Sequence, residues 1–320
     1  MKAIRIREFG APEVMKIEDV ADPTPGKGEI VVKVAAAGVN PVEAYIRSGL
    51  YPLTPGLPFT PGFDGAGVVE KIGEGVGRFR PDDRVYIAGS ISGTYAEKVL
   101  CREEQVHILP DKIPFEQGAA LGVPYATAHR ALFHLAKARP GETLLIHGAT
   151  GGVGTATVQT AKAAGLRIIC TGGTEEGRRM LLEQGAHFVL NHHDEAHMDE
   201  VLRITEGVGA DVVIEFLANV NLGKDLAALA LKGRVVVIGS RGTVEIDPRQ
   251  AMSRDAAILG MVLFNATDRE LMSIHAAIGA GLETGILNPV IGRRYPLADA
   301  ASAHHHIMET GAFGKKVLIP

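Results

Sequence analysis

Hydrophobic and polar positions in the second half of the chain alternate between short apolar runs and longer segments with helical spacing. The apolar runs have the length of strands and lie at residues 143–147, 167–171, 186–191, 211–216, 234–239 and 256–264. Helical segments separate them, one directly after the first run and others at 175–184, 194–206 and 221–231. This alternation predicts right-handed crossovers and a parallel sheet with helices on both faces. The chain is therefore predicted to contain an α/β, Rossmann doubly wound sheet of six strands.

Residues 1 to about 124 follow a different pattern. Their alternating segments, 30–34, 67–72 and 84–88, are interrupted by Gly and Pro, as in a small antiparallel β-barrel. A helix is predicted at 268–283, and a last strand at 315–319 indicates that the C-terminus returns to the first domain. Because 320 residues exceed one ordinary core, we predict two domains. We expect residues 1–124 and 265–320 to form one domain, and residues 125–264 to form the other.

A glycine turn, Gly148 to Gly154, joins the first strand of the parallel sheet to its helix. Its spacing is an AxGxxG variant of the dinucleotide fingerprint, with Ala149 at the usual first glycine. Gly151 would let the backbone approach a pyrophosphate, and Gly154 would let the helix pack closely on the strand. The helix N-terminus supplies free N–H groups for phosphates. Such a turn is weak evidence alone, and the strand–helix alternation behind it strengthens the prediction.

The end of the second strand predicts the choice of dinucleotide. NAD-selective folds place an Asp or Glu there to bind the ribose hydroxyls, whereas this chain has Thr171, Gly172 and Gly173. The two glycines leave room for a 2′-phosphate, and Glu175 and Glu176 are expected to lie along the first turn of the next helix. We therefore expect NADPH as the cofactor. The nearby cations are Arg178, Arg179 and His192, with Arg178 the first choice because guanidinium matches phosphate geometry.

Composition excludes several classes of protein. Hydrophobic residues make up 46% of the chain and charged residues 22%, which is typical of a globular protein. The net charge of −4 gives no reason to expect nucleic acid as the main partner. Cys101 and Cys170 are too few and too far apart for a disulfide framework or a cysteine-rich zinc site. The N-terminus lacks a signal-peptide pattern and no apolar run is long enough for a membrane span, so we expect a cytoplasmic protein.

Several segments carry a family resemblance through nearly the whole chain. They include AGVNPVEAYIRSGLY (37–51), TPGFDGAGVVEKIG (60–73), HGATGGVG (147–154), EFLANVNLGKDLAALA (215–230) and IGSRGTVEIDPR (238–249). The chain resembles the medium-chain dehydrogenase/reductase superfamily and, within it, the zeta-crystallin-like quinone oxidoreductases. The resemblance implies a GroES-like β-barrel catalytic domain and assembly as homodimers or homotetramers. The long apolar sixth strand, 256–264, is the expected edge for this self-association.

No catalytic zinc is expected. The positions that match the zinc ligands of the superfamily hold Asn40, Phe63–Asp64 and Val123, which cannot replace thiolate and imidazole ligands. The four-cysteine structural-zinc lobe is also missing. His193 with His197, and the run His304–His306, are alternative metal ligands, but no acidic third ligand accompanies them. The competing interpretation of these histidines is that they lie on solvated helix faces.

Tyr45 is the residue that the resemblance places beside the nicotinamide, close to the substrate. A phenol is a hydrogen-bond donor at neutral pH and could polarise a carbonyl group. The alternative is a half-buried aromatic whose hydroxyl is satisfied locally. Asn40 and Tyr51 are further candidates for the same pocket, and Thr127 is given no role.

The resemblance also assigns cofactor contacts. Those at the pyrophosphate are Thr150, Gly151, Gly152 and Val153, and those on the adenosine side are Gly173 and His192. Those on the nicotinamide half, besides Tyr45, are Asn221, Ile238, Gly239, Ser240, Arg241, Met261, Val262 and Leu263. Residues 261–263 are also expected to be part of an ordinary sheet strand.

The predicted function is a zinc-independent NADPH:quinone oxidoreductase, because quinones accept hydride or electrons without a metal or an acid–base pair. The resemblance implies one-electron transfer, which nothing in the residues demands. One alternative is an NADPH-dependent reductase of α,β-unsaturated carbonyls (enals and enones), in which Tyr45 stabilises the enolate. Another, also implied by the resemblance, is an AU-rich RNA-binding crystallin-like protein.

Overall fold

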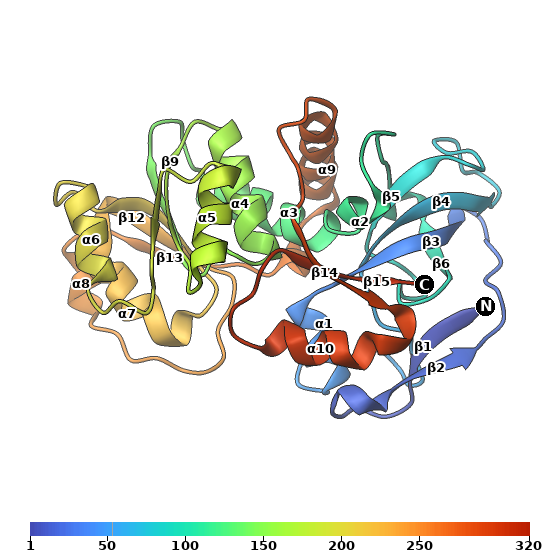
Figure 1. Ribbon diagram of the computed structural model, residues 1–320. Helices are drawn as coiled ribbons and strands as arrows, with labels where there is room; N and C mark the ends of the chain where they lie inside the picture. The colour runs from blue at the N-terminus through green and yellow to red at the C-terminus, as the bar shows by residue number, and fades with distance from the viewer. Residues whose placement is uncertain (53) are drawn as a thin grey trace. The chain divides into compact units, whose positions relative to one another are not determined.

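The computed structural model describes residues 1–52 and 54–320. Figure 1 shows the chain as a ribbon, and its contacts divide it into two compact units. The first unit comprises Met1–Val123 and Ala277–Pro320, and the second comprises Pro124–Ala276. Among the helices of the described chain, none is both long enough and apolar enough to cross a membrane.

The second crossing between the units lies later than the predicted residue 264. The reason is that α9 (Asp268–Glu283) is one continuous helix whose two ends belong to different units. Near its start, Glu270 pairs with Arg130 in the second unit. At its end, the carbonyl of Glu283 accepts a hydrogen bond from Lys112 in the first unit. Helix α9 therefore makes contacts within each unit, and the chain returns to the first unit after Ala276.

The second unit is built on a parallel sheet with the strand order β10-β9-β8-β11-β12-β13. Its strands are β8 (Thr143–Ile146), β9 (Arg167–Thr171), β10 (Phe188–Leu190), β11 (Ala210–Glu215), β12 (Leu229–Val237) and β13 (Ala257–Gly260). The chain runs outward from β8 to β10 and then returns to β11 beside β8. This reversal makes the carboxyl ends of β8 and β11 the switch point at which ligands bind in such folds. The predicted six-stranded Rossmann sheet is confirmed.

Helices cover this sheet in two groups. They are α4 (Gly152–Ala163), α5 (Glu175–Gln184), α6 (His197–Ile204), α7 (Ala218–Ala228) and α8 (Pro248–Met252). Helix α4 packs on α5, whereas α7 packs on α6 and α8. Because the crossovers leave β8 in opposite directions, right-handed connections put the two groups on opposite faces. Local signals fix the ends of α5, where Thr174 accepts from the Gly177 N–H and Gly185 adopts φ 114°.

Two predicted elements have other bounds. The helix predicted at 221–231 spans Ala218–Ala228, because the residues that follow pair with β11 as the start of β12. The strand predicted at 256–264 is only Ala257–Gly260. The chain leaves the ladder after Met261 because Arg130 binds the carbonyls of Val262 and Asn265 and bends it into the short helix η4 (Leu263–Asn265). Residues 262 and 263 are therefore not part of the sheet, contrary to the sequence interpretation.

The first unit is the predicted GroES-like domain. Its main sheet has the order β14-β15-β3-β4-β5-β7, with β6 also paired to β3, and β1 and β2 form a separate pair. The strands are β1 (Lys2–Ile6), β2 (Met15–Asp19), β3 (Glu29–Val39), β4 (Asp64–Ile72), β5 (Arg84–Ala88), β6 (Lys98–Arg102), β7 (Val106–Ile108), β14 (Ile291–Pro296) and β15 (Lys315–Ile319). The C-terminal strand β15 pairs antiparallel with β3, so the predicted return of the C-terminus is confirmed.

Short helices connect these strands. They are η1 (Pro12–Val14), α1 (Pro41–Arg47), η2 (Glu103–Gln105), α2 (Phe115–Gly118), η5 (Leu297–Asp299) and α10 (Ala300–Met308), and the chain enters the second unit through α3 (Gly122–His129) and the π-helical turn η3 (Arg130–Leu135). Helix α10 packs against α1 and β15. Its buried residues Ala300 and Ala303 join Leu318 in the core of the unit. This packing holds α1 and its tyrosine, Tyr45, in a fixed place on the sheet.

Candidate active site

The glycine turn follows β8 at the switch point of the second unit. Gly148 adopts φ 52°, which favours glycine, and its N–H donates to the Thr171 hydroxyl at 2.9 Å. The Ala149 N–H donates to the carbonyl of Thr171, also at 2.9 Å. A Cβ on Gly154 would lie 2.3 Å from the Ala149 oxygen, so only glycine lets α4 pack so closely on the turn. The turn therefore presents the N-terminus of α4 as an anion site, beginning at Gly151 and Gly152.

The residues predicted for the adenosine side lie together beyond this turn. Arg178, in the first turns of α5, donates through one nitrogen to the carbonyls of Gly172 and Gly173, both at 3.2 Å. A Cβ on Gly173 would lie 2.8 Å from the Nε2 atoms of His192 and His193. The end of β9 is thus bordered by a guanidinium and two imidazoles, and Glu175 and Glu176 are exposed in the first turn of α5.

The predicted nicotinamide contacts border a cleft at the carboxyl ends of β12 and β13. The cleft has a volume of about 450 Å³. Its lining residues are Val237, Ile238, Gly239, Ser240, Gly260, Met261, Val262 and Asn265. Five predicted residues are among them, while Arg241 and Leu263 adjoin the lining in sequence.

Backbone hydrogen bonds hold the walls of the cleft. The carbonyl of Glu215 accepts from the N–H groups of Ile238 and Gly239 at 2.8 and 3.3 Å. Asn219 Oδ1 accepts from the Arg241 N–H at 2.9 Å. A Cβ on Gly239 would lie 2.4 Å from the carbonyl oxygen of Phe216, so glycine is required where this wall meets β11. Features of both the turn and the cleft fit the dinucleotide predicted from the sequence.

In the first unit, Tyr45 lies on α1 and is half-buried. The start of α1 is fixed by a capping box, in which Asn40 is the N-cap and Glu43 is the N3 residue. Tyr51 follows in the loop and is also half-buried, and burial raises the pKa of its phenol. The loop predicted at 50–62 includes Leu53, which is outside the described residues.

Asn40 does not face an open pocket. Only 3% of it is exposed, and its side-chain amide is bound on every side. Its Nδ2 donates to Glu43 Oε1 at 3.3 Å and to Asp64 Oδ2 at 2.9 Å, while its Oδ1 accepts from the ammonium group of Lys315. These bonds tie the N-terminus of α1 to β4 and β15, which makes Asn40 a residue that positions α1.

Lys315 gives this cluster a buried cation. Its Nζ lies 2.8 Å from Asp64 Oδ2, and the exposed fractions of the two side chains are 3% and 0%. The other oxygen of Asp64 accepts from the Val123 N–H at 2.7 Å. Both carboxylate oxygens are therefore satisfied, and the charge of the buried carboxylate is balanced inside the core.

Glu43 completes the network on the other side of Asn40. It accepts from the N–H groups of Asn40 and Phe63 and from the hydroxyl of Tyr95, at 2.7, 3.0 and 2.6 Å. Burial raises the pKa of Glu43 to about 6. The Tyr95 oxygen lies 3.1 Å from Nε2 of His304, whose pKa burial lowers to about 3. His304 is fully buried and neutral, so the interpretation of residues 304–306 as a solvated helix face is wrong for this histidine.

This arrangement does not fit a zinc ion. Of the four positions that match zinc ligands in the superfamily, Phe63 and Val123 offer no side-chain donor atom. The side-chain oxygens of Asn40 and Asp64 already bind the Lys315 ammonium. A divalent cation here would have to displace that ammonium, which repels it.

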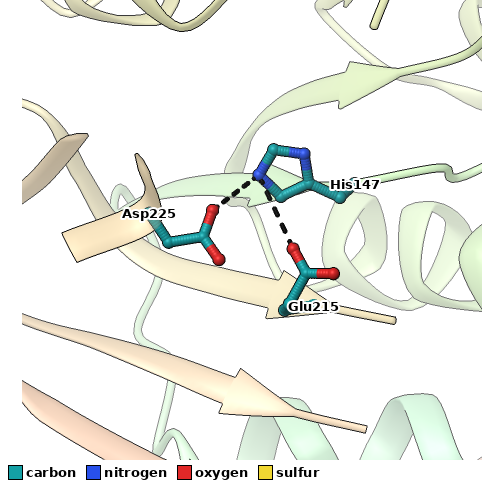
Figure 2. A group of neighbouring side chains, drawn as sticks. All are labelled: His147, Glu215 and Asp225. Carbon is teal, nitrogen blue, oxygen red and sulfur yellow. Dashed lines mark hydrogen bonds and ion pairs between the residues drawn. The ribbon is translucent and has the colours of Figure 1, made fainter. Parts of the chain in front are cut away.

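The histidines predicted as alternative ligands do not form a helical pair. Helix α6 begins at His197, so His193 precedes the helix, and His197 is buried with its Nδ1 2.6 Å from the Asp194 carbonyl. Within the described part of the chain, one group of three potential ligands occurs, at the ends of β8 and β11: His147, Glu215 and Asp225 (Figure 2). All three are buried.

Sequence reasoning missed both buried clusters. The capping box around Asn40 and Glu43 is a local signal that could have been recognised. A lysine that begins an apolar strand is a weaker signal, since it does not identify the partner. Nothing in the sequence brings Lys315 to Asp64, which is 251 residues away.

Known proteins resemble this chain over its full length. A family profile described as an alcohol dehydrogenase GroES-like domain matches residues 26–111, and one described as a zinc-binding dehydrogenase matches 152–276. A quinone oxidoreductase of Homo sapiens is 50% identical over 100% of this chain and 98% of its own length. The crystal structure of an Escherichia coli quinone oxidoreductase complexed with NADPH superposes with a TM-score of 0.88, at 30% identity and 100% coverage of both chains. An NAD-dependent alcohol dehydrogenase superposes with a TM-score of 0.93, at 31% identity and 100% coverage of both chains.

Proposed function

We infer that this chain, which belongs to the quinone oxidoreductases of the medium-chain dehydrogenase/reductase superfamily, oxidises NADPH and reduces quinones. The observation that carries this function is the 50% identity to a quinone oxidoreductase over the entire chain. The glycine turn and the cleft at the ends of β12 and β13 support it from the geometry. When bound, NADPH supplies the reducing equivalents, as hydride or as single electrons.

The residues of the second unit bind and orient the dinucleotide. The N–H groups at Gly151 to Val153 begin α4 and bind the pyrophosphate, beside the buried Thr150. Arg178 and His192 bind the 2′-phosphate at the end of β9. The cleft walls around Ile238 to Ser240 and Met261 would hold the nicotinamide half.

We propose that the reaction does not depend on zinc. The Lys315 ammonium occupies the side-chain oxygens of Asn40 and Asp64, so the cluster supplies its own cation. In this proposal the cluster fixes the start of α1, and α1 presents Tyr45 to the acceptor. Asn40 thereby contributes by positioning, and Tyr51 by lining the substrate site.

A panel of acceptors tests the function. NADPH oxidation is measured with several quinones, with enals and with enones, before and after exhaustive chelation. We expect turnover with quinones that survives chelation. Turnover with enals and enones alone would refute the proposal and favour the alternative, a reductase of α,β-unsaturated carbonyls. Salt-dependent retention of AU-rich RNA without NADPH turnover would favour the RNA-binding alternative, and loss of turnover together with loss of stoichiometric zinc would refute zinc independence.

Tyr45→Phe is expected to lower kcat/KM for enones about ten- to hundredfold and for quinones less than about threefold. The reason is that an enone develops negative charge on its carbonyl oxygen, and one lost hydrogen bond there costs about 1–3 kcal/mol. Steady-state kinetics on both substrate classes measures the difference, with Tyr51→Phe as the matched variant. Equal small losses for both classes would make Tyr45 a packing residue.

Self-association through β13 is a further part of the proposal. β13 is the last strand of its sheet, and it exposes Ile258, with Val262 and Phe264 just beyond it, at 43%, 44% and 42%. Exposed apolar side chains on a strand edge favour pairing with a second copy. We expect sedimentation velocity at micromolar concentration to give at least twice the chain mass of 33.8 kDa. Ile258→Lys is expected to shift the protein toward monomer while Met252→Lys is not; a monomeric wild type would refute this assembly.

The cytoplasm remains the proposed compartment. Cys101 and Cys170 are both free and buried, which is compatible with a reducing environment. Burial raises the pKa of both thiols well above its usual range, so neither is a reactive thiolate.

A further inference from the structure

The cluster of His147, Glu215 and Asp225 lies directly beneath the proposed dinucleotide site. His147 follows β8 and immediately precedes Gly148, the first residue of the glycine turn. Glu215 is the last residue of the neighbouring strand β11, and Asp225 comes from α7. Figure 2 shows both carboxyl groups pointing toward the imidazole. The three side chains are buried, with exposed fractions of 4%, 0% and 0%.

Hydrogen bonds account for only half of the carboxyl oxygens in this cluster. His147 Nε2 lies 2.8 Å from Asp225 Oδ1, the distance of a hydrogen bond, and 3.9 Å from Glu215 Oε2. One nitrogen carries one proton, so it donates to Asp225 and not to Glu215. Glu215 Oε2 and Asp225 Oδ2 are buried without a hydrogen-bond partner among the described residues. A buried acceptor without a donor is costly unless a proton or a cation is supplied.

The balance of charges in the cluster also indicates that one carboxyl group carries a proton. With both carboxylates ionised, even a charged imidazole leaves one uncompensated negative charge in the core. The other ionisable groups that act on the cluster are Lys224 of α7, His192 from the loop before α6, and His197, the first residue of α6. None of them forms a hydrogen bond or an ion pair with Glu215 in the described structure. A proton on Glu215 removes the repulsion between the carboxyl groups and turns its Oε2 into a donor.

Glu215 also forms hydrogen bonds to residues that line the cleft. Its Oε1 accepts from the Leu217 N–H and, at 3.3 Å, from Asn221 Nδ2, while its backbone carbonyl binds Ile238 and Gly239. The residue therefore connects the buried cluster to the segments assigned to the nicotinamide half. Glu215 also lies near the glycine turn in space, because its Oε2 is 3.9 Å from Nε2 of His147, the residue that immediately precedes Gly148.

We propose that Glu215 is a positioning residue for the dinucleotide, and that it carries an exchangeable proton whose loss weakens the binding of NADPH. An additional buried negative charge beneath the glycine turn repels the phosphates of the cofactor. It also repels the carboxylate of Asp225, so Glu215 is held less firmly between His147 and Asp225. The inference rests on the proposed function for its ligand. The proton itself can be tested without any cofactor.

The electrostatics agree with this assignment. Burial raises the pKa of Glu215 to about 7. For His147, burial lowers the pKa, but the hydrogen bond that it donates to Asp225 and the charges of both carboxylates raise the pKa above its ordinary value overall. Both groups therefore hold a proton more tightly in the folded than in the unfolded chain. Stability consequently falls as the pH rises, from the ordinary carboxyl range up through the folded pKa of Glu215 and then through the raised pKa of His147.

Glu215→Gln is the test, because glutamine reproduces the protonated carboxyl group. Its oxygen replaces Oε1, and its amide nitrogen is a permanent donor in place of Oε2. We expect the Kd of wild type for NADPH, measured by calorimetry, to rise about tenfold between pH 6 and 8.5. We expect the variant to show only the shallow pH dependence that the 2′-phosphate of NADPH itself causes. Glu195→Gln, an exposed residue on the loop before α6, is the matched control and should behave as wild type.

Denaturant unfolding of the cofactor-free protein gives the second readout. As the pH is raised from 5 to 8, the denaturant concentration at the unfolding midpoint of wild type should decrease. In Glu215→Gln most of this decrease should be absent. Asp225→Asn should move the fall to lower pH, because it removes the neighbouring negative charge that raises the pKa of Glu215. Identical pH profiles for wild type and Glu215→Gln would overturn the inference.

Two other outcomes are distinguishable. A wild type that does not bind NADPH at any pH would refute the proposed function, while the unfolding profiles would still decide whether Glu215 binds a proton. A metal ion is the other ligand that these three side chains could bind, and metal analysis of the purified protein tests for it. A stoichiometric metal ion that is lost in Glu215→Gln would replace the proton by a metal and overturn the inference.

Discussion

Replacing Lys315 with Met is expected to lower the free energy of unfolding of the first unit by about 3–5 kcal/mol, the usual cost of breaking a buried ion pair. The variant leaves the carboxylate of Asp64 in the core with only neutral donors, Asn40 Nδ2 and the Val123 N–H. It also leaves Asn40 Oδ1 without its ammonium donor. The loss should therefore exceed the cost of deleting the methylene groups of the lysine.

Tyrosine fluorescence during denaturation measures this loss. The chain has no Trp and 6 Tyr, and all of these except Tyr125 lie in the first unit, so the signal reports mainly on that unit. Lys316→Met is the matched control, since Lys316 is adjacent on β15 and is buried without an ion pair among the described residues. We expect the control to change stability by less than about 1 kcal/mol. An equally small effect of Lys315→Met would show that the ammonium is not the charge that balances Asp64.

Replacing Arg178 with Gln is expected to weaken NADPH binding about ten- to hundredfold and to leave NADH binding almost unchanged. A charged hydrogen bond to the 2′-phosphate is worth about 1.5–3 kcal/mol, and NADH lacks that phosphate. The structure places the guanidinium against the carbonyls of Gly172 and Gly173, at the end of β9. Gln keeps a donor for these carbonyls and removes only the charge, so it separates cofactor binding from local folding.

Binding titrations with both dinucleotides at two salt concentrations check this result. Arg179→Gln is the control, because Arg179 is exposed and lies 3.9 Å from Glu183 on the outer face of α5. The preference for NADPH should shrink as the salt concentration rises, since the site is near the surface. If wild type binds NADH as tightly as NADPH, the interpretation of the two glycines is wrong. The fold alone cannot decide the matter, because an NAD-dependent alcohol dehydrogenase superposes with a TM-score of 0.93.

The sequence predicted the parallel sheet because its signals are local. A buried parallel strand is a short apolar run, a covering helix has its own period, and glycines mark the connections. The bounds of β9, α5 and α9 agree with the predicted ranges for that reason. The predictions were wrong where a distant contact decides the bounds, as when Arg130 pulls the chain after Met261 out of the sheet.

Part of the candidate site likewise follows from local sequence signals, and the other part depends on distant contacts. Thr171, Gly172 and Gly173 were predicted to leave room at the end of β9, and the structure puts Arg178 and His192 beside them because all of these residues belong to adjacent strand–helix units. The sequence by itself therefore determined the fold class, and it predicted the place at which we propose that the dinucleotide binds.

Only the tertiary structure decided which charges are buried and with what partners. Lys315 meets Asp64 and Asn40 across 251 and 275 residues, and Asp225 meets His147 across 78. No local pattern encodes such pairs, because the charge of a side chain is set by its sequence while its partner is set by the packing of strands and helices. In water each of these groups would be an ordinary surface charge. Burial makes Lys315 an internal cation, and in our proposal it makes Glu215 a site that holds a proton, because the core contains no solvent to compensate these charges.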